Sequence, residues 1–191
     1  DRTGQGKTTL LTFLAGQAMR HHDLKVFFFD RHRGAEIFTR AVQGAYVGFD
    51  GDEKNVSLNP FDCRNTPNNR AFLRRWLKAI TMVDDALSEK EIGRAVTTAF
   101  DYLKPEERIL KNLYKSCFSP TGNMRRELFR WINPDQYGNI FNAENDSLDL
   151  ASKRFMAFDF THIFEDETLA PAVISYIMHR LSLIHISEPT R

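Results

Sequence analysis

Seven residues near the start of the chain have the types and the spacing needed to hold a polyphosphate. Thr3-Gly4-Gln5-Gly6-Lys7-Thr8-Thr9 matches the second half of the pattern G-x-x-x-x-G-K-[ST]. In such a loop the glycines let backbone N–H groups converge on a phosphate, the lysine reaches the β- and γ-phosphates, and the next hydroxyl binds Mg²⁺. An apolar helix directly after the loop adds the positive end of its dipole. We therefore predict that residues 3–9 bind ATP and Mg²⁺, with Lys7 as the catalytic cation and Thr8 as the metal ligand.

Hydrolysis of a bound triphosphate also requires an acid at the end of a buried strand, which holds the water shell of Mg²⁺. Two segments have this form, VFFFD ending at Asp30 and FMAFD ending at Asp159. Neither acid is followed by the glutamate that often polarises the attacking water, because Arg31 and Phe160 come next. Asp159 is the better placed, since Asp30 follows the first helix too early, but an acid at a strand end more commonly caps a turn.

Basic residues offer weaker signals. Arg31, His32 and Arg33 follow the first apolar strand, at the end where α/β folds bind ligands. The sequence favours a contact with phosphate and a solvated turn equally for these residues. The six histidines of the chain are not spaced as a metal site. The pairs at 74–75 and 125–126 fall on predicted helices, where a solvated face is favoured over a nucleic-acid patch.

The order of the elements predicts an α/β fold. A helix at 8–20 follows the loop, and the continuous apolar run at 25–30 predicts a strand buried on both faces. A helix at 35–42 comes next, and this alternation is typical of a parallel sheet. Further strands are predicted at 45–49, 56–58 and 154–160, with a final helix at 166–180.

The middle of the chain has a different pattern. Helical periodicity without an intervening strand covers 69–81, 88–103, 106–118 and 122–132, with prolines at 67, 105 and 120 as breakers. Ser88 and Glu91 form a capping-box pattern, and residues 137–150 are predicted to be a hairpin or loop. We therefore expect residues 3–62 to begin an ATPase domain, 63–135 to form a helical insertion, and 136–180 to return to the first domain.

The composition is that of an ordinary globular domain. The 191 residues are 42% hydrophobic and 27% charged, and no run of 18 apolar residues suggests a membrane span. The net charge of +1 provides no bulk argument for nucleic-acid binding. Two cysteines far apart in sequence predict free, reduced thiols, as in a cytoplasmic protein.

Both ends of the chain depart from these patterns. The loop pattern calls for glycine at position 1, and the carboxylate of Asp1 would repel a triphosphate. Residues 181–191 (LSLIHISEPTR), together with Asp1-Arg2, resemble a translated sequencing adapter read at both ends. We interpret residues 1–2 and 181–191 as adapter-derived tails, the alternative being that the last eleven residues are a genuine helix end.

Five segments together carry a family resemblance. They are GQGKTTLLTFL at 4–14, FFDRHRGAEIF at 28–38, LNPF at 58–61, NRAFLRRWL at 69–77 and RFMAFDFT at 154–161. Their order and spacing resemble the conjugal-transfer and type IV secretion ATPases of the TrbE/CagE type, over nearly all of residues 3–180. The segment DRHRGAE is far more specific than the phosphate loop.

The resemblance implies a RecA-like P-loop NTPase fold, here an incomplete α/β parallel sheet with an all-helical subdomain insertion. It implies a cytoplasmic ATP-hydrolysing motor, hexameric or dimeric, peripheral to the bacterial inner membrane and in contact with other secretion-channel subunits. Such a motor powers pilus assembly and the export of DNA or protein. Carried over by position, the nucleotide site is formed by Gly4, Gly6, Lys7, Thr8 and Thr9.

In that family the Walker B acids lie on a strand after the helix that we expect to end near Arg180. The resemblance therefore makes Asp30 and Asp159 non-catalytic, and we predict that this chain alone neither hydrolyses ATP nor folds tightly. Two rival functions stay open: a DNA-translocating motor of the coupling-protein or partition type, and a non-hydrolysing nucleotide-binding assembly subunit. No direct nucleic-acid signal is visible in this sequence.

Overall fold

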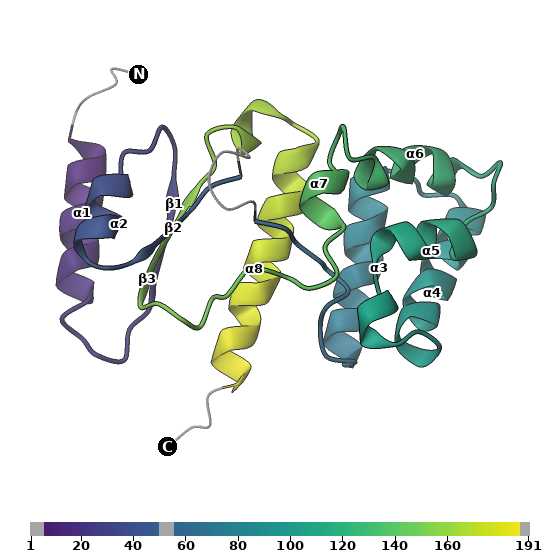
Figure 1. Ribbon diagram of the computed structural model, residues 1–191, viewed down its shortest axis with the longest axis horizontal. Helices are drawn as coiled ribbons and strands as arrows, with labels where there is room; N and C mark the ends of the chain where they lie inside the picture. Colours follow the sequence, from purple (N-terminus) through teal and green to yellow (C-terminus); the bar gives the residue numbers. More distant parts are fainter. Residues whose placement is uncertain (1–5, 50–55, 188–191) are drawn as a thin grey trace. The chain divides into compact units, whose positions relative to one another are not determined.

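The structure, a computed structural model, describes residues 6–49 and 56–187, with side chains through residue 184. These residues form two units, each with its own contacts (Figure 1). The sheet unit comprises residues 6–49 and 149–166, and the helical unit comprises residues 56–148 and 167–187.

Three parallel strands form the centre of the sheet unit, in the order β1 (Val26–Asp30), β3 (Phe155–Asp159), β2 (Ala45–Val47). Every residue of β3 is buried, as a central strand of apolar residues should be. Asp30 lies beside Asp159 in the register of β1 and β3, so both acids stand at the same carboxyl edge of the sheet.

Two helices pack on one face of this sheet, α1 (Lys7–Ala18) and α2 (Glu36–Ala41) (Figure 1). Ala15 of α1 and Phe38 of α2 both join the apolar cluster around Phe155 and Ala157 of β3. The aromatic rings of Phe29, Phe158 and Phe160 stack on one another, with centroids 5.3 to 6.4 Å apart. Apolar packing between distant segments therefore holds the sheet unit together.

The helical unit consists of bundled helices joined by short turns. They are α3 (Pro67–Thr81), α4 (Ala86–Asp101), the 3₁₀ turn η1 (Pro105–Glu107), α5 (Leu110–Cys117), α6 (Asn123–Ile132), α7 (Gly138–Phe141) and α8 (Leu169–Ser187); a second 3₁₀ turn, η2 (Ile163–Glu165), belongs to the sheet unit. Trp76 and Trp131 meet edge to face in the core, 6.3 Å between centroids. Each indole N–H donates to a backbone carbonyl, that of Ala172 and that of Ile80, both at 3.1 Å. The two buried donors are therefore satisfied without exposing the rings.

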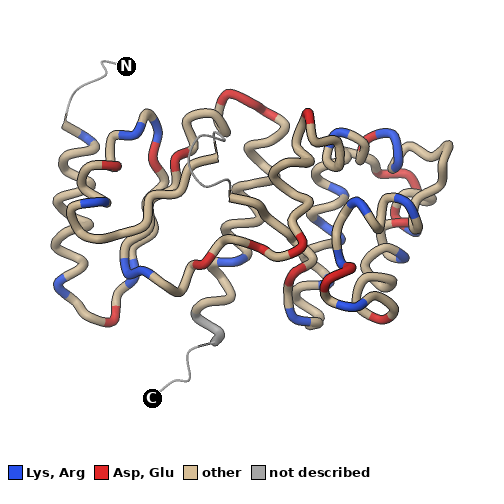
Figure 2. Tube along the Cα trace, viewed as in Figure 1, with Lys and Arg blue, Asp and Glu red and all other residues tan. Residues whose placement is uncertain are grey.

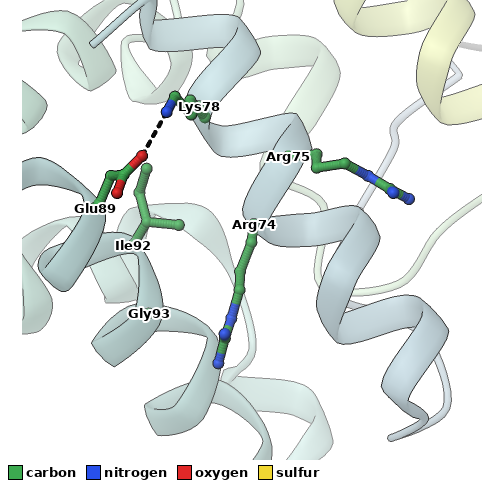
Figure 3. Close-up of a pocket in the computed structure, with 6 residues that line it drawn as sticks. All are labelled: Arg74, Arg75, Lys78, Glu89, Ile92 and Gly93. Carbon is green, nitrogen blue, oxygen red and sulfur yellow. Dashed lines mark hydrogen bonds and ion pairs between the residues drawn. The ribbon is translucent and has the colours of Figure 1, made fainter. Parts of the chain in front are cut away.

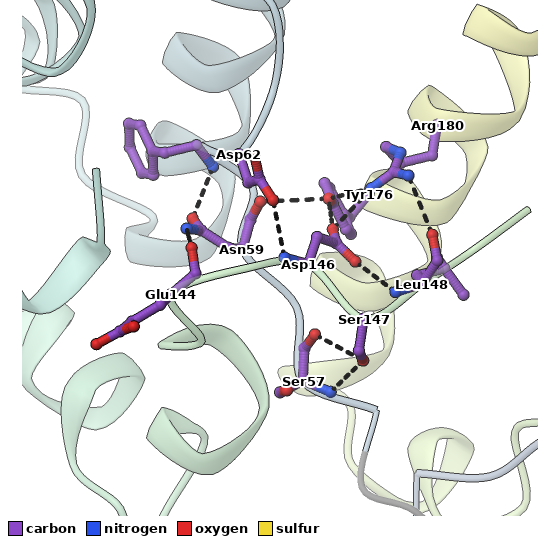
Figure 4. A network of polar contacts seen from close by, with 10 residues as sticks. Ser57, Asn59, Asp62, Glu144, Asp146, Ser147, Leu148, Tyr176 and Arg180 are labelled. Atoms are coloured by element: carbon purple, nitrogen blue, oxygen red, sulfur yellow. Dashed lines mark hydrogen bonds and ion pairs between the residues drawn. The ribbon is translucent and has the colours of Figure 1, made fainter. Parts of the chain in front are cut away.

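A buried polar network crosses the helical unit (Figure 4). The Asp146 carboxylate accepts from the Tyr176 hydroxyl and from Arg180 Nη1, the latter at 2.8 Å. Asn59, fully buried, donates its amide to the carbonyls of Arg108 and Glu144, both at 3.1 Å. The asparagine of the LNPF segment is therefore a structural connector of three stretches of chain.

The α/β fold class and the helical character of the middle segment are confirmed by this structure. The prediction of a strand at 56–58 is wrong. The backbone N–H of Leu58 donates to the carbonyl of Ile140, and the carbonyl of Ser57 accepts from the backbone N–H of Ser147. Because the partners belong to separate stretches, no continuous ladder forms.

Several helix boundaries also differ from the expected ones. Pro67 is the first residue of α3 rather than a breaker, since a helix needs no donor there and Thr66 caps it. The predicted capping box at Ser88 is wrong, because Asp85 caps α4 and Glu91 accepts from the backbone of Ser119. The expected helix at 106–118 is divided into η1 and α5, and α7 occupies part of the expected loop at 137–150. Helix α8 continues past residue 180 to Ser187.

Among the described residues, no helix is both long and apolar enough to cross a membrane.

Candidate nucleotide site

The described part of the predicted phosphate loop is the start of α1. Thr3, Gly4 and Gln5 lie outside the described residues, while Gly6 immediately precedes the helix. Gly6 has φ 71° and ψ 8°, a left-handed conformation that a side chain would strain. The chain can therefore turn sharply into α1 at this position because the residue is glycine.

The first turn of α1 has the polarity of an anion site. It contains no acidic residue and no side-chain cap, so the positive end of its dipole is not offset locally. The first N–H groups of any helix point out of its N-terminus, toward whatever lies there. Lys7, Thr8 and Thr9 are the first three residues of the helix, as a phosphate loop requires.

Gly34 brings Thr8 next to the carboxyl edge of the sheet. A Cβ atom at Gly34 would lie 3.1 Å from Cγ2 of Thr8, 3.5 Å from its Oγ1, and 3.6 Å from Oδ1 of Asp30. The hydroxyl predicted to bind Mg²⁺ and an acidic oxygen at the strand end therefore both line the space beside this glycine. Mg²⁺ keeps several of its waters in proteins, so an acid near the metal ligand can act through them.

Asp30 also organises the loop after β1. Its Oδ2 accepts from the backbone N–H of Ala35 at 2.8 Å and from the Tyr46 hydroxyl at 3.0 Å. Burial, and then the hydrogen bond to Asp30, raise the pKa of the Tyr46 hydroxyl above its ordinary value. The phenol thus stays protonated and continues to donate to the carboxylate; no motif in the sequence pointed to Tyr46.

Asp159 is engaged by its own loop and by the basic turn. Its Oδ1 accepts from the backbone N–H and the hydroxyl of Thr161, at 2.9 and 2.5 Å. Its Oδ2 lies 3.3 Å from Nε of Arg33. Asp159, the better placed of the two candidates for the Mg²⁺-binding Walker B acid, therefore has the contacts of an acid that forms a turn.

The basic turn after β1 is bent at two residues that are not glycine. His32 and Arg33 have φ angles of 66° and 56°, and each such residue costs on the order of 1–3 kcal/mol. The backbone N–H of His32 donates to Oγ1 of Thr161 at 2.7 Å, and Arg33 pairs with Asp159, so contacts across the sheet hold this conformation. Gly34 does not take the left-handed position; it provides the close approach to Thr8 instead.

Figure 2 shows acidic and basic positions close together at one end of the sheet unit. The carboxyl edge of a parallel sheet is where α/β proteins bind ligands. Tertiary structure brings Thr8, Asp30, Asp159 and Arg33 to this edge, while the basic pairs at 74–75 and 125–126 belong to the helical unit.

The other groups considered from the sequence do not form a site. No cluster of three or more histidine, cysteine, aspartate or glutamate residues suitable for a metal occurs within residues 6–49 and 56–187. Cys63 and Cys117 are free thiols, and burial raises the pKa of Cys63 to about 12. At neutral pH such a thiol is a poor nucleophile.

The parallel sheet, the glycine turn into α1 and the acids at the carboxyl edge define an α/β protein of the P-loop class. No family model matches the chain. It is, however, 31% identical over 185 residues to a type IV secretion system protein, virB4, of Bartonella henselae. It is 30% identical over 186 residues to the virB4 protein of Agrobacterium fabrum, and 24% identical over 188 residues to the conjugal transfer protein TrbE of Rhizobium radiobacter.

These alignments cover 93–94% of the chain, which spans only 22–23% of the length of those relatives. The solved structure of VirB4 of Thermoanaerobacter pseudethanolicus superposes with a TM-score of 0.72, over 94% of this chain and 54% of that one, at 15% identity. The resemblance predicted from the five segments is thus confirmed: nearly the whole chain is homologous to one stretch of the VirB4 and TrbE type IV secretion proteins.

Proposed function

We propose that this chain is the nucleotide-binding stretch of an ATPase that drives a type IV secretion or conjugative transfer apparatus. In this role Thr3 to Thr9 hold ATP, Lys7 neutralises the β- and γ-phosphates, and Thr8 ligates Mg²⁺. The observation that carries the proposal is the left-handed Gly6 at the start of α1, with Thr8 beside Asp30 at the carboxyl edge of the sheet. The likeness to VirB4 proteins supports it.

The same proposal assigns three ranges of the chain to domains. Residues 3–62 begin the RecA-like ATPase domain, 63–135 are its helical insertion, and 136–180 return to it. The whole protein works as a homo-oligomer, a hexamer or dimer, on the cytoplasmic side of the bacterial inner membrane. It contacts other secretion-channel subunits and powers pilus assembly and the export of DNA or protein.

We further propose that the 191-residue chain binds ATP without hydrolysing it. The two acids at the described carboxyl edge already have partners: Asp30 accepts from Ala35 and Tyr46, and Asp159 accepts from Thr161 and pairs with Arg33. An acid committed to its loop is a poor base for water, and the glutamate that often follows a Walker B acid is found after neither of them.

Titration of the chain with a fluorescent ATP analogue, with and without Mg²⁺, tests the binding. Lys7→Ala should weaken binding by about 1.5–3 kcal/mol, roughly 10- to 150-fold, because a charge-assisted contact is lost. Lys153→Ala, which removes an exposed lysine of the same unit, is the matched control and should leave affinity unchanged. Equal affinity of the two variants would contradict the assignment of the site, and lysine-dependent release of phosphate would contradict binding without hydrolysis.

A further inference from the structure

Helices α3 and α4 of the helical unit face each other through a row of charged side chains. Cations recur on α3 at every fourth position, Arg70, Arg74 and Lys78, and therefore lie on one helix face. Two of them pair across to α4: Nζ of Lys78 lies 2.5 Å from Oε1 of Glu89, and Arg70 pairs with Asp101. The first and last cations of the row are thus neutralised.

The middle cation of the row has no such acid opposite it. Arg74 is exposed, and within the described part of the chain its side chain makes no ion pair or hydrogen bond. The α4 residue beside it is Gly93, and a Cβ atom there would have nothing within 4 Å. A glycine in a helix interior costs about 0.5–1 kcal/mol relative to alanine, so the open space beside Arg74 goes with a less stable helix α4.

The space between Arg74 and Gly93 is a pocket of about 270 Å³. Its lining residues are Arg74, Arg75, Lys78, Glu89, Ile92 and Gly93. Figure 3 shows Arg74 extending alongside α4 toward Gly93, while Arg75 points away on the other side of α3. Ile92, only 4% exposed, adds an apolar surface. Pockets for small-molecule ligands are about 300–1,000 Å³, so this one suits a single side chain better than a nucleotide.

We propose that this pocket binds the carboxylate side chain of an aspartate or glutamate from a partner protein, with Arg74 as its anchor. Arginine presents a planar fork that matches a carboxylate with two parallel hydrogen bonds. A carboxylate placed here completes the row, between the pairs Lys78–Glu89 and Arg70–Asp101. The methylene groups of its side chain can rest on Ile92, and Glu89 at the rim disfavours a doubly charged phosphate more than a single carboxylate. The proposal concerns the helical unit alone and does not depend on the nucleotide site.

The test uses the ¹⁵N-labelled 191-residue chain, observed by NMR at the Nε–Hε group of Arg74 and the backbone amide of Gly93. The probe is the blocked peptide acetyl-Ala-Glu-Ala-amide, and the control peptide has glutamine in place of glutamate. We expect saturable shifts of both signals and up to about fivefold weaker binding of the glutamine peptide, because one exposed ion pair contributes at most about 1 kcal/mol. The Nε–Hε signal of Arg20, an exposed arginine of the sheet unit, should show no saturable shift.

Variants separate the pocket from general surface charge. Arg74→Gln should abolish the shift of Gly93, and Gly93→Gln should block the pocket. Arg20→Gln, which removes an exposed arginine of the sheet unit, is the control and should bind as the parent chain does. Fluorescence of Trp76 and Trp131 verifies that each variant is folded. Equal shifts with both peptides, binding that survives Arg74→Gln, or tighter binding of inorganic phosphate than of the glutamate peptide would each overturn the proposal.

Discussion

Replacing single glycines with alanine provides a graded test of how the site is assembled, because the structure states what each added methyl group would meet. At Gly93 a Cβ would have open space; at Gly34 it would meet the Thr8 methyl group at 3.1 Å; at Gly44 it would meet the backbone carbonyl of Phe155 at 2.7 Å. None of these three glycines has a positive φ angle, so steric contact rather than backbone strain decides the effect of each substitution.

The expected magnitudes follow from these distances. Gly93→Ala should stabilise the helical unit by about 0.5–1 kcal/mol, since alanine restricts the unfolded chain and favours the helix. At Gly34 the same gain is set against about 1–3 kcal/mol of overpacking, which leaves the sheet unit destabilised by about 1 kcal/mol. Gly44→Ala should cost more, roughly 2–3 kcal/mol, because a backbone carbonyl cannot rotate away as a side chain can.

The two units need separate measurements. Trp76 and Trp131 both belong to the helical unit, so tryptophan fluorescence during urea unfolding follows that unit. Hydrogen exchange of peptides from β1 and β3 follows the sheet unit. For Gly34→Ala we also expect MgATP affinity to fall by about threefold to tenfold, since Thr8 must move a few tenths of an ångström.

One result would refute this reasoning. If Gly34→Ala is as stable as the parent chain and binds MgATP equally well, then Thr8 is not positioned by its contact with the loop after β1. The matched controls are Gly93→Ala, which should leave nucleotide affinity unchanged, and Gly44→Ala, which should affect stability first.

Three further outcomes are expected. Tyr46→Phe should destabilise the sheet unit by about 1–3 kcal/mol because a buried oxygen of Asp30 loses one of its two donors and keeps only the N–H of Ala35. Since the folded-state pKa of Tyr46 is raised, the stability that the phenol contributes is present below its unfolded pKa of about 10 and is lost as the pH rises above it. The parent and Phe variants should therefore converge in hydrogen exchange of β1 and β3 at high pH. Tyr176→Phe should lower the free energy of unfolding of the helical unit by about 1–3 kcal/mol, seen as a lower urea midpoint of the tryptophan transition, because the Asp146 carboxylate is left with one donor fewer. An unchanged midpoint would show that the Tyr176 hydroxyl in the network of Figure 4 contributes nothing to stability. Cys63 is partly buried and its pKa is raised to about 12, so it should react with a thiol reagent at pH 8 far more slowly than it does in urea. Equal rates would mean that Cys63 is not shielded in solution as it is in the structure.

The sequence alone determined the local elements and the chemical character of the chain. The apolar runs at 25–30 and 154–160, the helical periods and the Gly-Lys-Thr turn depend on interactions between residues a few positions apart, and patterns of that kind can be recognised from the residues themselves. The same is true of the five segments that carry the family resemblance.

Tertiary structure alone decided which of these residues meet. Strand β3 inserts between β1 and β2 after the helical unit has intervened, and only this pairing brings Thr161 to the backbone of His32, 129 positions away. The left-handed turn at His32 and Arg33, the approach of Thr8 to Asp30 and the uncompensated Arg74 beside Gly93 likewise depend on distant or cross-helix contacts. No local propensity indicates such contacts, because their energy exists only once both partners have been brought together by the packing of the core.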